Sequence, residues 1–196
     1  MALSIISLCA LIVSIYQARV LSSQQRAMEA QQEIMIQNAK AQLWPNLQVF
    51  LNVNGREDGG VELDLGIANT GTGPAIVEGF QLQFRDKYLS TYRELWDALA
   101  APDSIQRNYG TTSIGNRTIQ AGESFSFLRF NTNYSLAQLL YDRINNGESP
   151  TFYVCYRSVF KDYYRLEATY DSNSFDVAEP AENCTLTGDG FDSRSY

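Results

Sequence analysis

The chain opens with an apolar stretch that predicts a membrane anchor. Residues 2–16 are almost entirely apolar, and the first charged residue is Arg19. Extended to Leu21, the stretch reaches about 20 residues, near the length that a helix needs to cross a bilayer. We therefore expect a transmembrane helix over residues 1–21. A cleaved signal peptide is the weaker alternative, because no basic residue precedes the stretch. The predicted anchor side chains are Leu3, Ile5, Ile6, Leu8, Leu11, Ile12, Val13, Ile15 and Tyr16.

Residues 22–44 predict a helical stalk that continues from the anchor. They are rich in Gln and Ala, contain no Gly or Pro, and are followed by Pro45, which a helix interior does not tolerate. Apolar side chains recur here every seven residues, but polar residues occupy the second seam that a coiled coil needs. We favour packing along the domain or a partner over a homo-oligomeric coiled coil. The predicted packing residues are Val20, Leu21, Met28, Ile34 and Met35.

After Pro45 the hydrophobic period changes to two, which is typical of β-strands. Residues 47–53 and 61–67 alternate apolar and polar side chains around a Gly-rich turn and predict a hairpin. Thr91 and Glu94 have the spacing of a helix capping box. The remaining patterns predict strands over 76–84, 111–120, 124–130, 151–160 and 163–170, with short helices over 90–101 and 134–146.

These elements predict a mainly β fold with one soluble domain. About seven strands in residues 45–170 indicate an immunoglobulin-like antiparallel β-sandwich with two short helical insertions. Residues 171–196 are polar and acidic and predict an extended tail. Within the domain, Asn69, Gly71, Gly73 and Pro74 predict a structural turn, because both glycines and Asn tolerate positive φ. The Lys-Ser/Thr pair of a phosphate-binding P-loop is missing there.

Charge and composition argue against several functions. The net charge is −7, of which residues 1–44 contribute +1 and the rest −8, so nucleic-acid binding is not expected. The chain has no His, the commonest general base and metal ligand. We therefore expect that the protein is not an enzyme and that it binds no cofactor and no metal ion. Three basic residues, Arg19, Arg26 and Lys40, lie on the C-terminal side of the apolar stretch and none lies on its N-terminal side, which favours a cytoplasmic domain on the inner membrane. Sequons such as that at Asn116 keep the periplasmic or extracellular side open.

Two cysteines are available to the domain, because Cys9 lies in the predicted anchor. Neither Cys155 nor Cys184 belongs to a CxxC pair. The favoured interpretation is a buried free Cys155 and a free Cys184 in the tail. The alternative is a Cys155–Cys184 disulfide that ties the tail to the sandwich, which would require an oxidising compartment.

Aromatic residues are abundant: the chain has 12 Tyr, 10 Phe and 2 Trp. In residues 151–170 they fall on both faces of the predicted strands, which favours a partner on one of them. An ordinary aromatic core is an equally good explanation. The candidate interface residues are Tyr153, Tyr156, Tyr163 and Tyr164.

Three short motifs follow the stalk: Leu43-Trp44-Pro45, the run from Asn69 to Ala75, and the run from Val154 to Phe160. With the stalk, they resemble a group of uncharacterised bacterial single-span membrane proteins that carry a β-sandwich. The resemblance implies this architecture and a bacterial origin, and it implies no catalytic residue.

The sequence thus predicts a non-catalytic accessory subunit that packs on a larger membrane complex, such as a respiratory or photosynthetic assembly. Its partners would be integral membrane protein subunits and the lipid bilayer. The alternative function is a membrane-tethered sensory module that binds a ligand or a peptide.

Overall fold

The computed structural model describes residues 2–57, 59–102, 104, 105, 108–130, 134–170, 178–186 and 191, with the backbone alone for residues 2–10. The chain forms two compact units, residues 1–42 and 43–196, which we describe separately. Over the described residues the fold is mainly β, with antiparallel sheets and three helices, as the sequence predicts.

The first unit is one helix, α1 (Ala2–Gln42), which runs for 41 residues. It runs past residue 21 without interruption because no Gly or Pro occurs before Pro45. Among the described residues, no helical segment combines the length and the hydropathy expected of a membrane span. The side chains of residues 1–10 lie outside that part, among them the predicted anchor residues Leu3, Ile5, Ile6 and Leu8. The remaining anchor residues Leu11, Ile12, Val13, Ile15 and Tyr16 are exposed.

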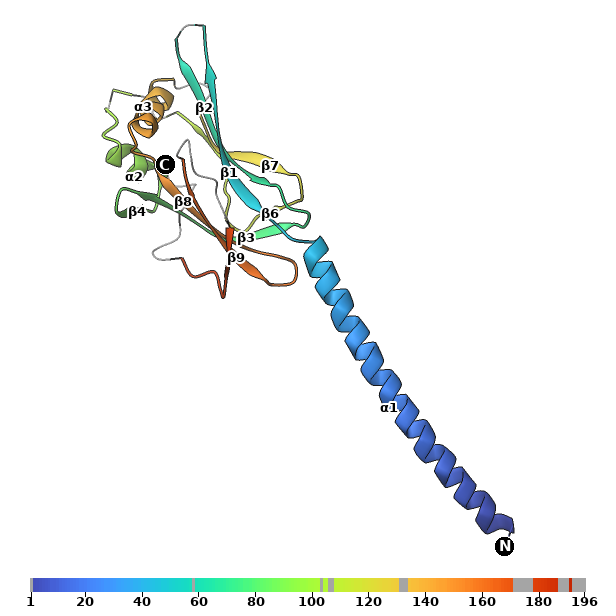
Figure 1. The fold of residues 1–196 in the computed structure, drawn as a ribbon. Coiled ribbons are helices and arrows are strands. Elements are labelled where there is room, and N and C mark those ends of the chain that lie inside the picture. Colours follow the sequence, from blue (N-terminus) through green and yellow to red (C-terminus); the bar gives the residue numbers. More distant parts are fainter. Residues whose placement is uncertain are drawn as a thin grey trace. The chain divides into compact units, whose positions relative to one another are not determined.

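The second unit contains two antiparallel sheets packed face to face in a β-sandwich-like arrangement (Figure 1). The first has the order β1-β2-β7-β5, with β1 (Leu47–Gly55), β2 (Val61–Asn69), β7 (Ser124–Phe130) and β5 (Gly110–Thr111). The second has the order β10-β9-β8-β3-β4, with β10 (Ala178–Ala181), β9 (Tyr163–Thr169), β8 (Thr151–Arg157), β3 (Ala75–Phe84) and β4 (Lys87–Leu89). A short strand, β6 (Thr118–Ile119), also pairs with β3.

Alternating side chains decide which face of each sheet is buried, as the period of two predicts. In the β1–β2 hairpin, Leu63, Leu65 and Ile67 are buried in the core, and the intervening positions point away from it. The predicted strand over residues 111–120 is wrong as a single element. It divides into β5 and β6, which belong to different sheets, and Asn116 between them adopts a positive φ of 58°. The chain therefore crosses from one sheet to the other at this turn.

Aromatic side chains fill the space between the sheets. The rings of Phe80 and Phe127 lie 5.5 Å apart, as do those of Phe127 and Phe152. Burial of each such ring contributes on the order of 1.5–3 kcal/mol relative to exposure. The helix α2 (Tyr92–Ala98) adds the fully buried Trp96 to this core, and α3 (Tyr134–Asn145) packs against β2 and β7.

The predicted capping box of α2 is confirmed. Thr91 Oγ1 accepts a hydrogen bond from the backbone N–H of Glu94 at 3.2 Å. The Glu94 carboxylate accepts one in return from the N–H of Ser90, one residue before the cap. One backbone donor of the first helical turn, Glu94 N–H, and the N–H of the residue before the cap are satisfied in this way.

The prediction of an extended polar tail is wrong for the residues of the tail that the structure describes. Residues 178–181 form β10, which pairs with β9, and Cys184, Leu186 and Phe191 each contact the sandwich. The tail holds these few apolar side chains among polar ones, so its average composition concealed the contacts.

Candidate functional site

The loop after β2 holds the segment that follows α1 through the side chain of Asn69. Its amide nitrogen donates to Gly73 O at 2.8 Å and to Ile119 O at 3.0 Å. Its oxygen accepts from the backbone N–H of Asn46 at 3.2 Å and of Gly71 at 3.0 Å. Asn69 is buried, and these four bonds use its full hydrogen-bonding capacity. The predicted structural turn is therefore confirmed, and it joins three separate segments.

Two positions of this loop require glycine, because the backbone of another segment approaches them closely. A Cβ atom on Gly71 would overlap the carbonyl oxygen of Trp44, and one on Gly73 would overlap that of Leu43. The backbone N–H of Thr72 donates to Trp44 O at 2.9 Å across the same contact. The predicted reason, a positive φ, is wrong at both glycines. Residues 43–46 therefore lie directly against the backbone of this loop.

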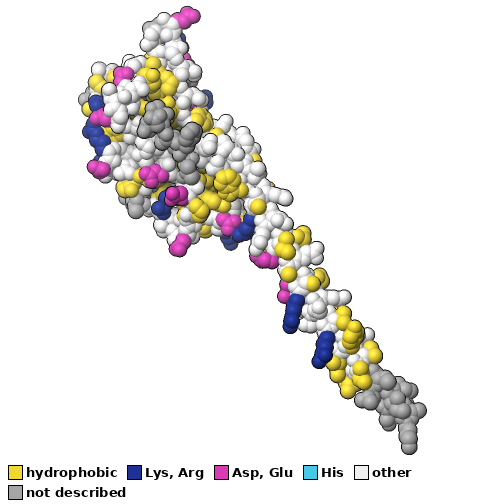
Figure 2. Space-filling model, in the orientation of Figure 1, with side chains coloured by type: hydrophobic (Ala, Val, Ile, Leu, Met, Phe, Trp, Pro, Cys, Tyr) yellow, Lys and Arg dark blue, Asp and Glu magenta, His cyan; other side chains and the backbone are white. Residues whose placement is uncertain are grey.

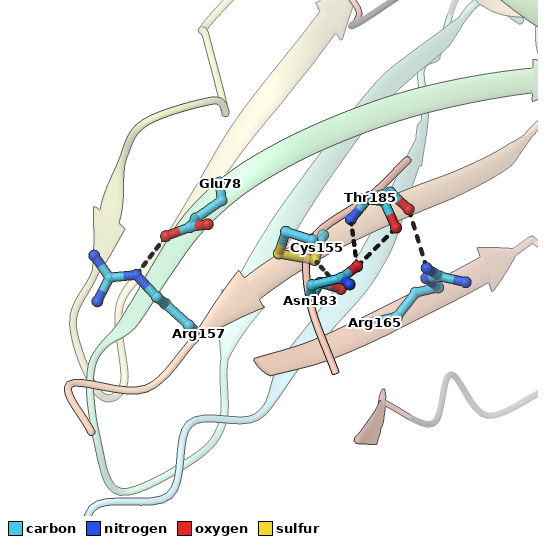
Figure 3. Close-up of a disulfide and its surroundings, with 7 residues drawn as sticks. Glu78, Cys155, Arg157, Arg165, Asn183 and Thr185 are labelled. Atoms are coloured by element: carbon cyan, nitrogen blue, oxygen red, sulfur yellow. Dashed lines mark hydrogen bonds and ion pairs between the residues drawn. A yellow bond between two sulfur atoms is a disulfide. The ribbon is translucent and has the colours of Figure 1, made fainter. Parts of the chain in front are cut away.

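A disulfide joins β8 to the tail, so the alternative pairing of Cys155 with Cys184 is the one that the structure has (Figure 3). The two Cα atoms lie 5.5 Å apart, within the range that a disulfide spans. Nearby, Arg165 donates to the carbonyl oxygen of Thr185 at 3.1 Å, and Thr185 N–H donates to Asn183 Oδ1 at 3.2 Å. The favoured interpretation of two free thiols is wrong.

Two described residues of the tail beyond the disulfide contact the domain. Leu186 lies over Gly79 of β3, where a Cβ atom would meet the leucine side chain at 2.7 Å. The N–H of Phe191 donates to Phe80 O at 3.3 Å, and its ring lies 4.7 Å from that of Tyr92. These contacts and the disulfide attach the tail to β8, β3 and α2.

The four candidate interface tyrosines do not form one surface. Tyr156 is completely buried, so its assignment to an interface is wrong. It occupies the same face of β8 as Phe152 and Val154, which the period of two makes a core position. Its hydroxyl accepts a hydrogen bond from Leu47 N–H at 3.3 Å, and burial raises its pKa to about 12. Tyr164 stacks on it, with 5.4 Å between the ring centroids.

Tyr153 and Tyr163 are partly exposed. The hydroxyl of Tyr153 donates to Gln83 Oε1 at 2.8 Å on the face of the second sheet that points away from the core. Partial burial, with a smaller contribution from the Glu167 carboxylate, raises the pKa of Tyr153 above its ordinary value. Of the four candidate tyrosines, only these two remain candidates for an interface on that face.

A groove of about 590 Å³ lies on the face of the first sheet that points away from the core. Its volume falls within the roughly 300–1,000 Å³ of typical small-molecule sites. Phe50 lies opposite Gly66 in the β1–β2 register, and its ring occupies the space where a Gly66 side chain would stand. Glycine inside a strand often marks such a close approach, but the sequence alone does not show that Phe50 is the neighbour. Further lining residues are Asn52, Asp64, Thr111, Thr112, Arg117, Ser124, Phe125, Ser126 and Arg129.

Both arginines of the groove have carboxylate partners. Arg117 lies over the ring of Phe125 at 3.8 Å and forms an ion pair of 3.0 Å with Glu123. The pKa of Glu123 is lowered first by the hydrogen bond from Gln120 N–H and then by Arg117. Arg129 donates to Ser126 Oγ at 3.0 Å and lies 3.7 Å from Asp64 Oδ2. The second oxygen, Asp64 Oδ1, is buried and has no hydrogen-bond partner among the described residues.

The predicted stalk residues lie on the surface of α1, where Val20, Leu21, Met28, Ile34 and Met35 are all exposed. Figure 2 shows apolar side chains interspersed with polar ones along this helix. Among the residues that the structure describes, no three acidic or Cys side chains gather as metal ligands would. The groove was missed at the sequence level, because its residues come from separate strands and a loop.

Comparison with models of protein families, with curated proteins and with solved structures finds no match for this chain. The resemblance to bacterial single-span membrane proteins therefore stays a prediction.

Proposed function

We propose that the protein is a non-catalytic accessory subunit, anchored by the N-terminal part of α1 and packed on integral membrane subunits of a larger complex. The observation that carries this proposal is α1 itself. It is an uninterrupted helix of 41 residues that is followed directly by the folded domain, and from residue 11 onward its large apolar side chains are exposed. Large exposed apolar surfaces mark contacts with lipid or protein.

The apolar side chains of α1 suggest two kinds of contact. Residues 11–16 are nearly all apolar, as a lipid-facing segment requires. Farther along, Leu21, Met28 and Met35 recur every seven residues between polar neighbours, which suits the narrow contact of one helix with another. We assign the first segment to the bilayer and the second to a partner subunit.

The mass of the extracted protein tests this proposal. Membranes of the native cell would be solubilised in a mild detergent, and the intact particle weighed by native mass spectrometry. We expect a particle with other polypeptides, well above the 22.0 kDa of the chain plus detergent. A chain that stays in the soluble fraction, or that migrates alone from the membrane, overturns the proposal.

Substitutions on α1 locate the contact. Met28→Gln/Met35→Gln removes two apolar side chains from one face, and we expect the complex to dissociate to the single chain. Ser23→Ala/Gln37→Ala is the matched control, because 100° per residue places these positions on the opposite side of the helix. Equal behaviour of the two variants would assign the packing to another surface.

We further propose that the domain lies on the outer side of the membrane. The Cys155–Cys184 disulfide supports this side, because disulfides persist in oxidising compartments. It outweighs the three basic residues that favour the cytoplasm, since their bias is small. Acid-trapped cells would be denatured and treated with a polyethylene-glycol maleimide, which reacts with free thiols. One adduct, on Cys9, is expected, and three adducts would place the domain in a reducing compartment.

A second function, the binding of a ligand or peptide by a membrane-tethered module, is favoured by the groove on the first sheet. The groove has the size of a ligand site and combines aromatic rings with hydrogen-bonding groups. This function is compatible with a subunit role, because the groove and α1 belong to different units of the chain.

A further inference from the structure

The groove contains an aromatic ring, that of Phe50, which the rest of the described domain covers only in part. Phe50 lies opposite Gly66 and is only partly buried, although a large apolar side chain is usually placed in the core. Its ring lies over the backbone of β2 in the space that the missing side chain leaves. Phe125 adds a second ring, one side of which Arg117 covers. A ligand with apolar C–H groups can therefore pack on Phe50.

The charges of the groove disfavour an anionic ligand. Arg117 is paired with Glu123, and Arg129 is paired with Asp64. Residues 45–196 carry a net charge of −8, which repels anions at longer range. A bound phosphate, sulfate or carboxylate would have to compete with carboxylates that are already present.

The polar groups of the groove instead match a ligand with many hydroxyls. The Asp64 side chain lines the groove and is 24% exposed, although its oxygen Oδ1 is itself buried, so the carboxylate accepts from a ligand through its other oxygen, Oδ2. Asn52 stands opposite Asp64 in the β1–β2 register and also lines the groove. Hydroxyl groups both donate and accept, which suits this mixture of carboxylate, amide and hydroxyl side chains. Those hydroxyl side chains are Thr111, Thr112, Ser124 and Ser126.

We propose that this groove binds a neutral saccharide, with one sugar ring packed on Phe50 and one of its hydroxyls donating to Oδ2 of Asp64. A pyranose has an apolar face of C–H groups and an equatorial rim of hydroxyls, which are the two features that the groove complements. The negative face of an aromatic ring attracts such C–H groups. The inference rests on the second function proposed above, ligand binding, and it names the class of ligand.

A peptide fits this groove less well. Peptides that join a sheet do so at an open edge, through backbone hydrogen bonds. Most of the groove lies across the faces of β1, β2 and β7, where side chains project. It reaches the edge of the sheet only at residues 110–112, a segment that pairs with β7 and is too short to template an added strand. Peptide binding is therefore an outcome of the test and is not the proposal.

The full chain, in an amine-oxide detergent that contains no sugar, would be applied to an array of oligosaccharides. The array carries neutral hexose and N-acetylhexosamine oligomers, matched uronate and sulfated oligomers, and extended peptides. Binding of a neutral oligomer, followed by titration calorimetry with that oligomer, is expected. Phe50→Ala and Asp64→Asn should each raise the dissociation constant about tenfold or more, because the first removes the ring contact and the second removes the charged acceptor.

The control is Gln48→Ala, at an exposed position of β1 that does not line the groove, and it should bind like the unchanged protein. Circular dichroism and the unfolding temperature of each variant show whether it is folded, and Ser126→Ala gives a smaller change in the same groove if Phe50→Ala fails to fold. If a charged oligomer or a peptide binds instead, and Phe50→Ala abolishes that binding, the neutral saccharide is ruled out while ligand binding by the groove stands. Binding that the groove variants leave unchanged, or the absence of any binding, overturns both.

Discussion

Asn69 and Asn46 are joined by a hydrogen bond of 3.2 Å between the side-chain oxygen of the first and the backbone N–H of the second. A buried side chain at the end of β2 thus fixes the segment that enters β1. Backbone hydrogen bonds from Thr70 to Asn46 and from Thr72 to Trp44 reinforce the same contact. The start of the domain is therefore held by a loop 23 residues later in the sequence.

Replacing Asn69 tests how much this contact contributes. We expect Asn69→Ala to lower the free energy of unfolding by about 2–4 kcal/mol, because it leaves several buried backbone groups without partners. Urea denaturation of the full chain in detergent, followed by tryptophan fluorescence, measures the change. Asn54→Ala, at an exposed position of β1, is the control and should change stability by less than about 0.5 kcal/mol. Equal losses in both variants would contradict this role of Asn69.

A methyl group at Gly73 should disturb the same contact by steric overlap. Gly73→Ala places a Cβ atom against the backbone of Leu43, where no flexible side chain can move aside. We expect a loss of about 1–3 kcal/mol in the free energy of unfolding. Gly115→Ala is a suitable comparison, because nothing lies within 4 Å of its added Cβ atom. If both alanines are tolerated equally, residues 43–46 do not lie against the loop as described.

The disulfide should contribute strongly to stability. Cys155 and Cys184 are separated by 29 residues, and closure of such a loop restricts the unfolded chain by about 3–4 kcal/mol. In a Cys9→Ser background, Cys184→Ser should lower the urea midpoint accordingly. Dithiothreitol should have the same effect on the parent protein and none on the variant. A parent protein whose midpoint is insensitive to the reductant would contradict the prediction.

Alkaline pH should destabilise the domain through Tyr156. Its pKa in the folded protein is raised to about 12 from an ordinary value of 10.0, so folding favours the protonated hydroxyl. The resulting stabilisation is complete below pH 10 and declines as the pH rises towards 12. Burial raises the pKa of Tyr92 as well, which acts in the same direction. Urea midpoints between pH 8 and 12 should fall less steeply for Tyr156→Phe than for the parent, and identical slopes would contradict the assignment.

Much of the fold could be predicted from local patterns. Alternation identified β1 and β2 because one face of each packs on the core, and the spacing of Thr91 and Glu94 identified the start of α2. The shortest strands were missed, because two to four residues are too few to show a period. The same alternation placed Tyr156 with Phe152 in the core, and the interface assignment overlooked it.

The candidate site depended on contacts between distant residues. Phe50 and Gly66 are brought together by strand register, and Asp64 meets Arg129 across two paired strands. The disulfide depended on the path of the tail, which composition does not reveal. Sequence patterns report which face of an element is buried, but they do not report which elements become neighbours.

The short strand β10 has a consequence for how copies of this protein behave at high concentration. It pairs with β9 over four residues, and one of these is Pro180, which has no N–H to offer to a further strand. The edge of the second sheet thus ends in a strand that is a poor template for another chain. Loss of residues 178–181 would uncover β9, and edge-to-edge aggregation would follow.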